Sequence, residues 1–124
     1  MTAVAELLES AARDLSDASA APDPGNRYIH AHLAALRAAA ALVAVRSGQE
    51  RLPRPARLRS VWELLASTVP EFAGQASVFA AGAHKREAAG AGLPRAVTCQ
   101  EADVLLGEAR VLVEAAQAAA GGPS

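Results

Sequence analysis

The sequence predicts an all-α fold: an antiparallel up-and-down bundle of four to five helices in one domain over residues 1–124, with its core over about residues 3–120. Hydrophobic residues make up 52% of the chain but aromatic residues only 3%, so alanine, leucine and valine must form the core. Alanine is the best helix former, and β-branched runs that favour strands are missing. Four windows repeat apolar residues at three- and four-residue spacing, as helices do. A length of 124 residues fits one domain.

The first helix is predicted over residues 3–18. Its apolar residues follow a helical period, and charged residues occupy the opposite face. The apolar set is Val4, Leu7, Leu8, Ala11, Ala12 and Leu15. Pro22, Pro24 and Gly25 then predict a turn. Asp23 before Pro24 matches an N-cap followed by proline at the first helical position, so a second helix begins there.

The second helix, over residues 26–46, has the strongest helical pattern in the chain. Its larger apolar residues step by four, three, four and three, which is typical of a coiled-coil-like seam. The seam consists of Ile29, Leu33, Leu36, Ala40 and Val43. Alanines widen this apolar face, so we expect the helix to be central and contacted on several sides.

The third helical segment is predicted over residues 60–89. Ser60 and Glu63 form a capping-box pattern at its start. Trp62 follows the cap, and we expect it in the core because a bundle this poor in aromatics gains most by burying its largest ring. Residues 68–71 repeat the capping-box pattern around a proline, which predicts a kink or a restart of the helix near that point.

The fourth helix is predicted over residues 99–120. Thr98 and Glu101 form a third capping-box pattern at its start. Its inward-facing residues are Ala102, Leu105, Leu106, Ala109, Leu112, Val113 and Ala116. With the three segments before it, this helix completes the bundle.

The composition limits the cellular compartments and the classes of protein that are compatible with this sequence. The formal net charge is −1, which excludes a strongly polybasic chain. Cys99 is the single cysteine, so neither a disulfide framework nor a cysteine zinc cluster is expected. The N-terminus lacks the basic and apolar regions of a signal peptide, and the longest uncharged apolar stretch, Ala38 to Val45, is too short to span a bilayer. We therefore expect a cytoplasmic protein without a membrane partner.

The first turns of the second helix carry the residues best suited to chemistry, Arg27, His30 and His32. Guanidinium grips phosphate in a fork, and imidazole acts as a general acid or base near neutral pH. At about 100° per residue, His30 lies about 60° from Arg27 and His32 about 140° from it. Arg27 and His32 therefore meet only in an irregular first turn or across two chains. The alternative is that all three are polar residues at an exposed helix start.

We expect no metal site and no cofactor. His30 and His32 are two positions apart on a helix, so their side chains point apart, and no cysteine or acid cluster is adjacent in sequence. The sequence also lacks a glycine-rich phosphate loop, a Ser/His/Asp arrangement and a spaced carboxylate pair.

A basic, proline-containing loop is predicted between the second and third segments. It carries Arg51, Arg54, Arg57 and Arg59. These arginines are candidates for nucleic-acid phosphate contacts. No aromatic residues are interleaved to stack on bases, so a solvated loop is the alternative.

Arg27 and His32 have the spacing Arg-x4-His. Residues 27–40, which include this motif, and residues 60–66, 70–72, 79–86 and 101–106 carry a family pattern. Together these stretches resemble the HEPN superfamily (higher eukaryote and prokaryote nucleotide-binding), and within it a small actinobacterial branch. It implies an α-helical up-and-down bundle that often dimerises.

In active members of the superfamily, an arginine and a histidine from each subunit form a metal-independent RNA-cleaving site at the dimer interface. By position, the resemblance implies that Arg27 and His32 are those residues, and we expect His30 to assist. Tyr28 follows the arginine where active members usually have a small polar residue. Many other members act as RNA-binding or protein-interaction modules without cleaving RNA.

Two functions are therefore open. The first is a homodimeric HEPN-like protein that binds RNA and cleaves it as a metal-independent endoribonuclease. The second is a non-catalytic helical module that docks on a protein partner, for example as an accessory in toxin–antitoxin or nucleic-acid processing systems. The surroundings of Arg27 and His32 discriminate between them, because structural hydrogen bonds to these side chains argue against catalysis.

Overall fold

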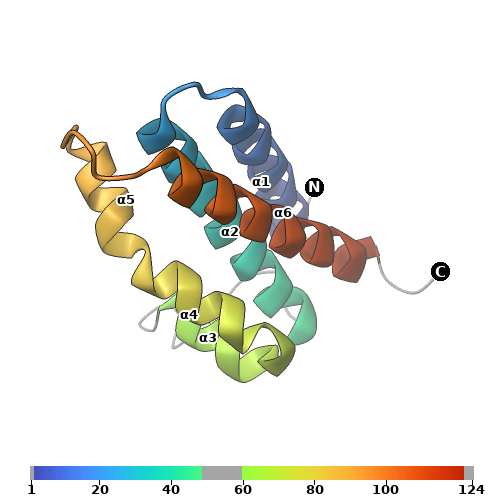
Figure 1. Cartoon of the computed structure of the whole chain (residues 1–124). Coiled ribbons are helices and arrows are strands. Elements are labelled where there is room, and N and C mark those ends of the chain that lie inside the picture. The colour runs from blue at the N-terminus through green and yellow to red at the C-terminus, as the bar shows by residue number, and fades with distance from the viewer. Residues whose placement is uncertain (1, 49–59, 122–124) are drawn as a thin grey trace.

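The structure is a computed structural model that describes residues 2–48 and 60–121. Over these residues the regular elements are helices, with no strand (Figure 1). The predicted all-α bundle is confirmed. Three long helices lie side by side, and a series of short helices crosses on one side of them.

The first two long helices, α1 (Ala3–Ala20) and α2 (Pro24–Arg46), form an antiparallel hairpin. The side chain of Asp23 accepts a hydrogen bond from the backbone N–H of Asn26 at 2.9 Å, and proline occupies the first turn of α2. The predicted N-cap is therefore confirmed. It satisfies one of the N–H groups that every helix start leaves without an intrahelical partner.

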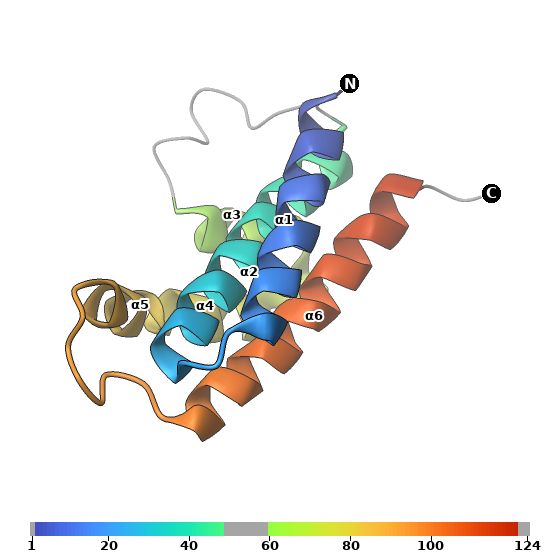
Figure 2. The same cartoon turned by 90° about the horizontal axis from the view of Figure 1, so that it is seen from above.

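The third long helix, α6 (Cys99–Gly121), lies against both α1 and α2 (Figure 2). Its capping box is complete: Glu101 N–H donates to Oγ1 of Thr98 at 3.0 Å, and Thr98 N–H donates to Oε1 of Glu101 at 2.9 Å. α6 runs antiparallel to α1 but in the same direction as α2, so Arg27 and Asp103, near the starts of the two helices, are paired.

Short helices make the crossover from α2 back to the start of α6. They are α3 (Val61–Thr68), the 3₁₀ helix η2 (Pro70–Phe72), α4 (Ala73–Ala81) and α5 (Ala83–Gly90). The predicted break near Pro70 is confirmed, and a second break at Gly82 separates α4 from α5. This crossover returns the chain to the end of the bundle where α2 begins. α2 and α6 can therefore run in parallel although they are distant in sequence.

The predicted capping boxes of this segment differ in outcome. Ser60 caps α3 by accepting from the backbone N–H groups of Trp62 and Glu63. The second box is wrong, because no side chain in the described part of the protein caps the start of η2. Glu71 instead forms an ion pair with Arg46 at the end of α2, with Nη2 2.8 Å from Oε2.

The core is built on the alanine face of α2. The fully buried alanines of this helix are Ala31, Ala34, Ala35, Ala38, Ala39 and Ala41. Because α1 and α6 approach over these small side chains, α2 is the central helix, as predicted. The predicted seam is wrong in detail: of its five residues only Val43 is buried, and the others lie half-buried at the edges of the contacts. The predicted burial of Trp62 is confirmed.

The length and apolar composition of α2 also meet the criteria for a membrane-spanning helix. However, 61% of its apolar window is buried inside the bundle. Packing of α2 against α1, α3, α5 and α6 therefore accounts for its apolar character.

Candidate functional site

Arg27 ties three elements together. Its Nε and Nη2 atoms donate to the carbonyl oxygen of Ala21 at 3.2 and 3.0 Å, and Nη2 also lies 3.4 Å from the carbonyl oxygen of Pro22. Its Nη1 atom pairs with Oδ1 of Asp103 on α6 at 2.6 Å. Carbonyl groups at a helix end lack intrahelical partners. Arg27 therefore holds the end of α1 against the starts of α2 and α6.

His32 is a core residue with hydrogen-bond partners on both ring nitrogens. Its Nε2 lies 2.9 Å from the carbonyl oxygen of Phe79, and its Nδ1 lies 3.4 Å from Nη1 of Arg86. A carbonyl oxygen only accepts and a guanidinium only donates. The neutral tautomer that carries its proton on Nε2 satisfies both contacts. With 1% of its surface exposed, the ring has no open face toward solvent.

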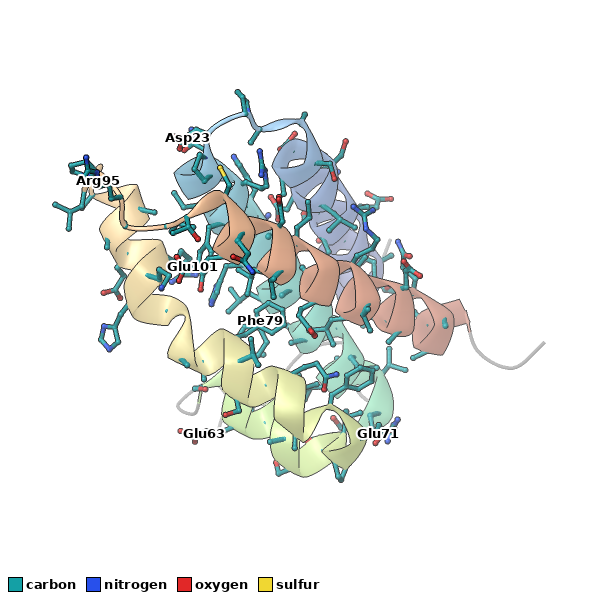
Figure 3. The ribbon with its side chains drawn as sticks, viewed as in Figure 1. Asp23, Glu63, Glu71, Phe79, Arg95 and Glu101 are labelled. Carbon is teal, nitrogen blue, oxygen red and sulfur yellow. The ribbon has the colours of Figure 1, made fainter. Side chains whose placement is uncertain are left out.

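Aromatic rings surround His32. Tyr28 stacks on it with ring centroids 6.4 Å apart, and Trp62 and Phe79 meet it edge-on at 5.8 and 5.9 Å. Figure 3 shows Phe79 in the interior, where α4 faces the long helices. Burial lowers the pKa of His32 below its usual value, and the positive charge of Arg86 lowers it further, against the hydrogen bond to Phe79. The ring is therefore uncharged at neutral pH.

His30 points away from His32, toward α1. It is half-buried, and its Nδ1 atom is buried without a hydrogen-bond partner among the described residues. Its neighbours on α1 are Asp14 and Asp17. His30 and His32 therefore belong to different surroundings, as the spacing of two residues on a helix predicts.

Within one chain, Arg27 and His32 do not share a site. Arg27 points toward α1 and α6, whereas His32 points toward α4 and α5, which agrees with the angle of about 140° on an ideal helix. Catalysis by Arg27, His32 and His30 stays a prediction. The predicted nucleic-acid contacts of Arg51, Arg54, Arg57 and Arg59 lie outside the described residues.

Tyr28 lies between the buried His32 ring and a hollow in the protein surface. Its residue type alone did not predict this position. Together with residues of α4, α5 and α6 it lines a hollow of about 300 Å³. The lining residues are Tyr28, Val78, Lys85, Gln100, Glu101, Val104 and Leu105. Val78 and Val104 are 47% and 59% exposed, so the hollow opens onto an apolar surface. The i, i+4 spacing of Tyr28 and His32 is the signal that could have linked them.

An ion pair between Lys85 and Glu101 crosses one edge of this hollow. Figure 3 shows Glu101 at the start of α6, where it faces α5. The hydrogen bond from Lys85, and then that from the backbone of Thr98, lower the pKa of Glu101 to about 2. Burial raises the pKa of the neighbouring Tyr28 hydroxyl. At neutral pH the hollow is therefore lined by the uncharged phenol of Tyr28 and by the ion pair of Lys85 and Glu101, whose charges cancel.

Comparison with known proteins identifies a family for most of the chain. The family model described as HEPN_SAV_6107-like HEPN matches residues 18–117. Neither the curated proteins nor the solved structures contain a match. The matched range contains α2 to α5 and most of α6, and with them Arg27, His32 and the hollow beside Tyr28.

Proposed function

The chain belongs to the HEPN_SAV_6107-like HEPN family, and from that premise we propose that it acts in the cytoplasm as a non-catalytic helical module that pairs with a second copy of itself. The observation that carries this proposal is the apolar surface around the hollow beside Tyr28. Val78 and Val104 lie on that surface, and Val111 continues it seven residues further along the same side of α6. Exposed apolar residues that gather on one side favour an interaction surface.

A two-fold arrangement suits this surface. In a symmetric dimer both copies use the same patch, and every contact from one residue to another is repeated in the reverse direction, so the patch must complement itself. Val78 and Val104 supply apolar side chains for such a contact. Lys85 and Glu101 at the edge offer both charges, so either residue can also pair with its opposite in the second copy.

The surroundings of His32 support a module that does not cleave RNA. General acid–base catalysis requires an imidazole that reaches the substrate and changes protonation near the working pH. The His32 ring is buried, both of its nitrogens are occupied, and its pKa is lowered by burial. Arg27 is held by two backbone carbonyls and one carboxylate.

Measuring the mass in solution tests self-association. Light scattering after size-exclusion chromatography is expected to give twice the 12.6 kDa of the chain. Val104→Asp places a charge on the apolar surface and is expected to give the mass of one chain. The matched control is Leu93→Asp, since Leu93 is equally exposed but lies in the loop before α6. The mass is measured over a series of protein concentrations that extends to the millimolar range. A wild-type protein that remains monomeric at every concentration contradicts the proposal.

RNA binding with metal-independent cleavage by Arg27, His32 and His30 is the second candidate. One observation favours it besides the Arg-x4-His spacing. The Asp103 side chain that pairs with Arg27 is 64% exposed, and a phosphate can take the place of a carboxylate on a guanidinium. Asp103→Asn would then raise the affinity for RNA.

A cleavage assay separates the two candidates. We expect purified wild-type protein to leave a mixture of single-stranded and hairpin RNAs intact in the presence of EDTA. Cleavage by the wild type that disappears in a folded His32→Gln variant would instead establish the second candidate. Circular dichroism of the variant confirms that its helices are retained.

A further inference from the structure

A histidine and two aspartates from adjacent helices gather between α1 and α2. Asp14 and Asp17 are three residues apart on α1, and His30 faces them from α2. One potential ligand atom from each residue lies within 4.8 Å of the others. From the sequence we expected no metal site, because His30 and His32 point apart and no cysteine or acid cluster is adjacent to them in sequence. The aspartates are brought to His30 by the antiparallel hairpin.

The His30 ring leaves a polar atom unsatisfied in this cluster. Nδ1 is buried and has no hydrogen-bond partner among the described residues. Buried polar atoms are nearly always paired, so an unpaired one calls for an explanation. A cation held between the imidazole and the carboxylates would use this lone pair.

The two aspartates differ in ways that suit a metal site. Asp14 is buried, and its Oδ2 accepts a hydrogen bond from Arg37, which orients the carboxylate and leaves lone pairs on its other oxygen. Carboxylates that bind metals are commonly oriented by a second hydrogen bond of this kind. Asp17 is exposed, so its side chain can rotate toward an ion and the site is accessible from solvent.

We propose that Asp14, Asp17 and His30 bind Zn²⁺. Imidazole and carboxylate are both zinc ligands, whereas Mg²⁺ and Ca²⁺ prefer oxygen ligands alone. Zinc bonds of about 2.0–2.2 Å require the donor atoms to lie roughly 3.5 Å apart, and rotation of the exposed Asp17 side chain closes that distance. Three protein ligands leave a fourth position for water. The bound ion would join α1 to α2, a role independent of self-association.

Calorimetry and thermal unfolding of the tag-free full-length protein test the site. Titration with ZnCl₂ is expected to show one ion per chain, and zinc is expected to raise the melting temperature, with EDTA reversing the rise. Co²⁺ is expected to give the visible absorption of a tetrahedral site. His30→Ala and Asp17→Asn are expected to lose these effects. The matched controls His84→Ala and Glu114→Gln, both at exposed positions, are expected to retain them.

Two results would overturn the site. One is a wild-type melting temperature that does not change with zinc. The other is a rise of equal size in Asp17→Asn, which keeps the exposed position polar and leaves the core untouched. Neither result bears on the dimer, because the mass in solution is measured separately in EDTA.

Discussion

Nε2 of His32 lies 2.9 Å from the carbonyl oxygen of Phe79, which is 47 residues away in sequence. Phe79 belongs to the last turn of α4, and its carbonyl oxygen also accepts a hydrogen bond from the backbone N–H of Gly82 at 3.2 Å. α4 ends at Gly82, and the imidazole of His32 on α2 hydrogen-bonds the Phe79 carbonyl next to that break. The break between α4 and α5 and the buried histidine are therefore parts of one arrangement.

Replacing His32 is expected to destabilise the fold. His32→Ala leaves the Phe79 carbonyl without the imidazole and opens a cavity among three aromatic rings. Large-to-small changes in a core cost roughly 2–5 kcal/mol in free energy of unfolding. Urea denaturation measures the change. His84→Ala on the surface of α5 is the control and is expected to change stability by less than about 0.5 kcal/mol. Equal effects of the two variants would contradict a structural role for His32.

The lowered pKa of His32 predicts a pH dependence of stability. The unfolded chain binds a proton at this histidine near its usual pKa of about 6.5, whereas the folded chain resists protonation until a lower pH. The unfolded state therefore holds more protons in this window, and stability falls as the pH is lowered from about 7 toward the pKa of the folded state.

Urea midpoints from pH 7.5 to 5 measure this slope. It is expected to be reduced in His32→Gln, which cannot be protonated. Glu101 acts in a separate, more acidic window, since its lowered pKa contributes stability that is lost only as the pH falls from its usual 4.5 toward about 2. A slope above pH 5 that is the same in His32→Gln and wild type would contradict the assignment to His32.

Arg27 is expected to matter more for its backbone contacts than for its ion pair. Arg27→Ala removes the donors to Ala21 and Pro22 and is expected to cost about 1–3 kcal/mol, as for hydrogen bonds to charged groups. Asp103→Asn removes only a partner that is mostly exposed and is expected to cost less than about 1 kcal/mol. Chemical denaturation of both variants gives the comparison. A larger loss in Asp103→Asn would show that the ion pair dominates.

Local sequence signals predicted much of this fold because they depend on neighbouring residues. Asp23 with Pro24, and Thr98 with Glu101, are caps whose partners lie within three residues, and both formed as expected. The capping pattern at residues 68–71 failed because Thr68 is the last residue of α3, and Glu71 pairs instead with Arg46, which is 25 residues away. Nothing in the local pattern reveals such a competitor.

The candidate site was harder to predict for the same reason. Helical spacing gave the divergence of Arg27 and His32 correctly, because it is set by one helix. Arg27 contacts the turn that follows α1 and also Asp103 on α6, the partners of His32 lie on α4 and α5, and those of His30 lie on α1. Their positions depend on how the helices pack, which the alanine-rich pattern of α2 does not specify.

Gly82 is expected to be required for the close approach of Tyr28. A Cβ atom at position 82 would lie 2.4 Å from the Tyr28 hydroxyl oxygen, well inside contact distance. The ring of Tyr28 is buried and stacked on His32, so it cannot move away without disturbing the core. Gly82→Ala is therefore expected to lower the free energy of unfolding by roughly 1–3 kcal/mol.

The control for Gly82→Ala is Gly107→Ala on α6, where none of the described residues lies within 4 Å of an added Cβ. That change is expected to raise stability by about 0.5–1 kcal/mol, because alanine favours the helix more than glycine does. Tyr28→Phe removes the clashing oxygen and leaves the next ring atom at 3.4 Å, so it is expected to relieve part of the loss in a double variant. A double-mutant cycle by urea denaturation measures this coupling. Additive effects, or a Gly82→Ala variant as stable as Gly107→Ala, would contradict the packing of Tyr28 against Gly82.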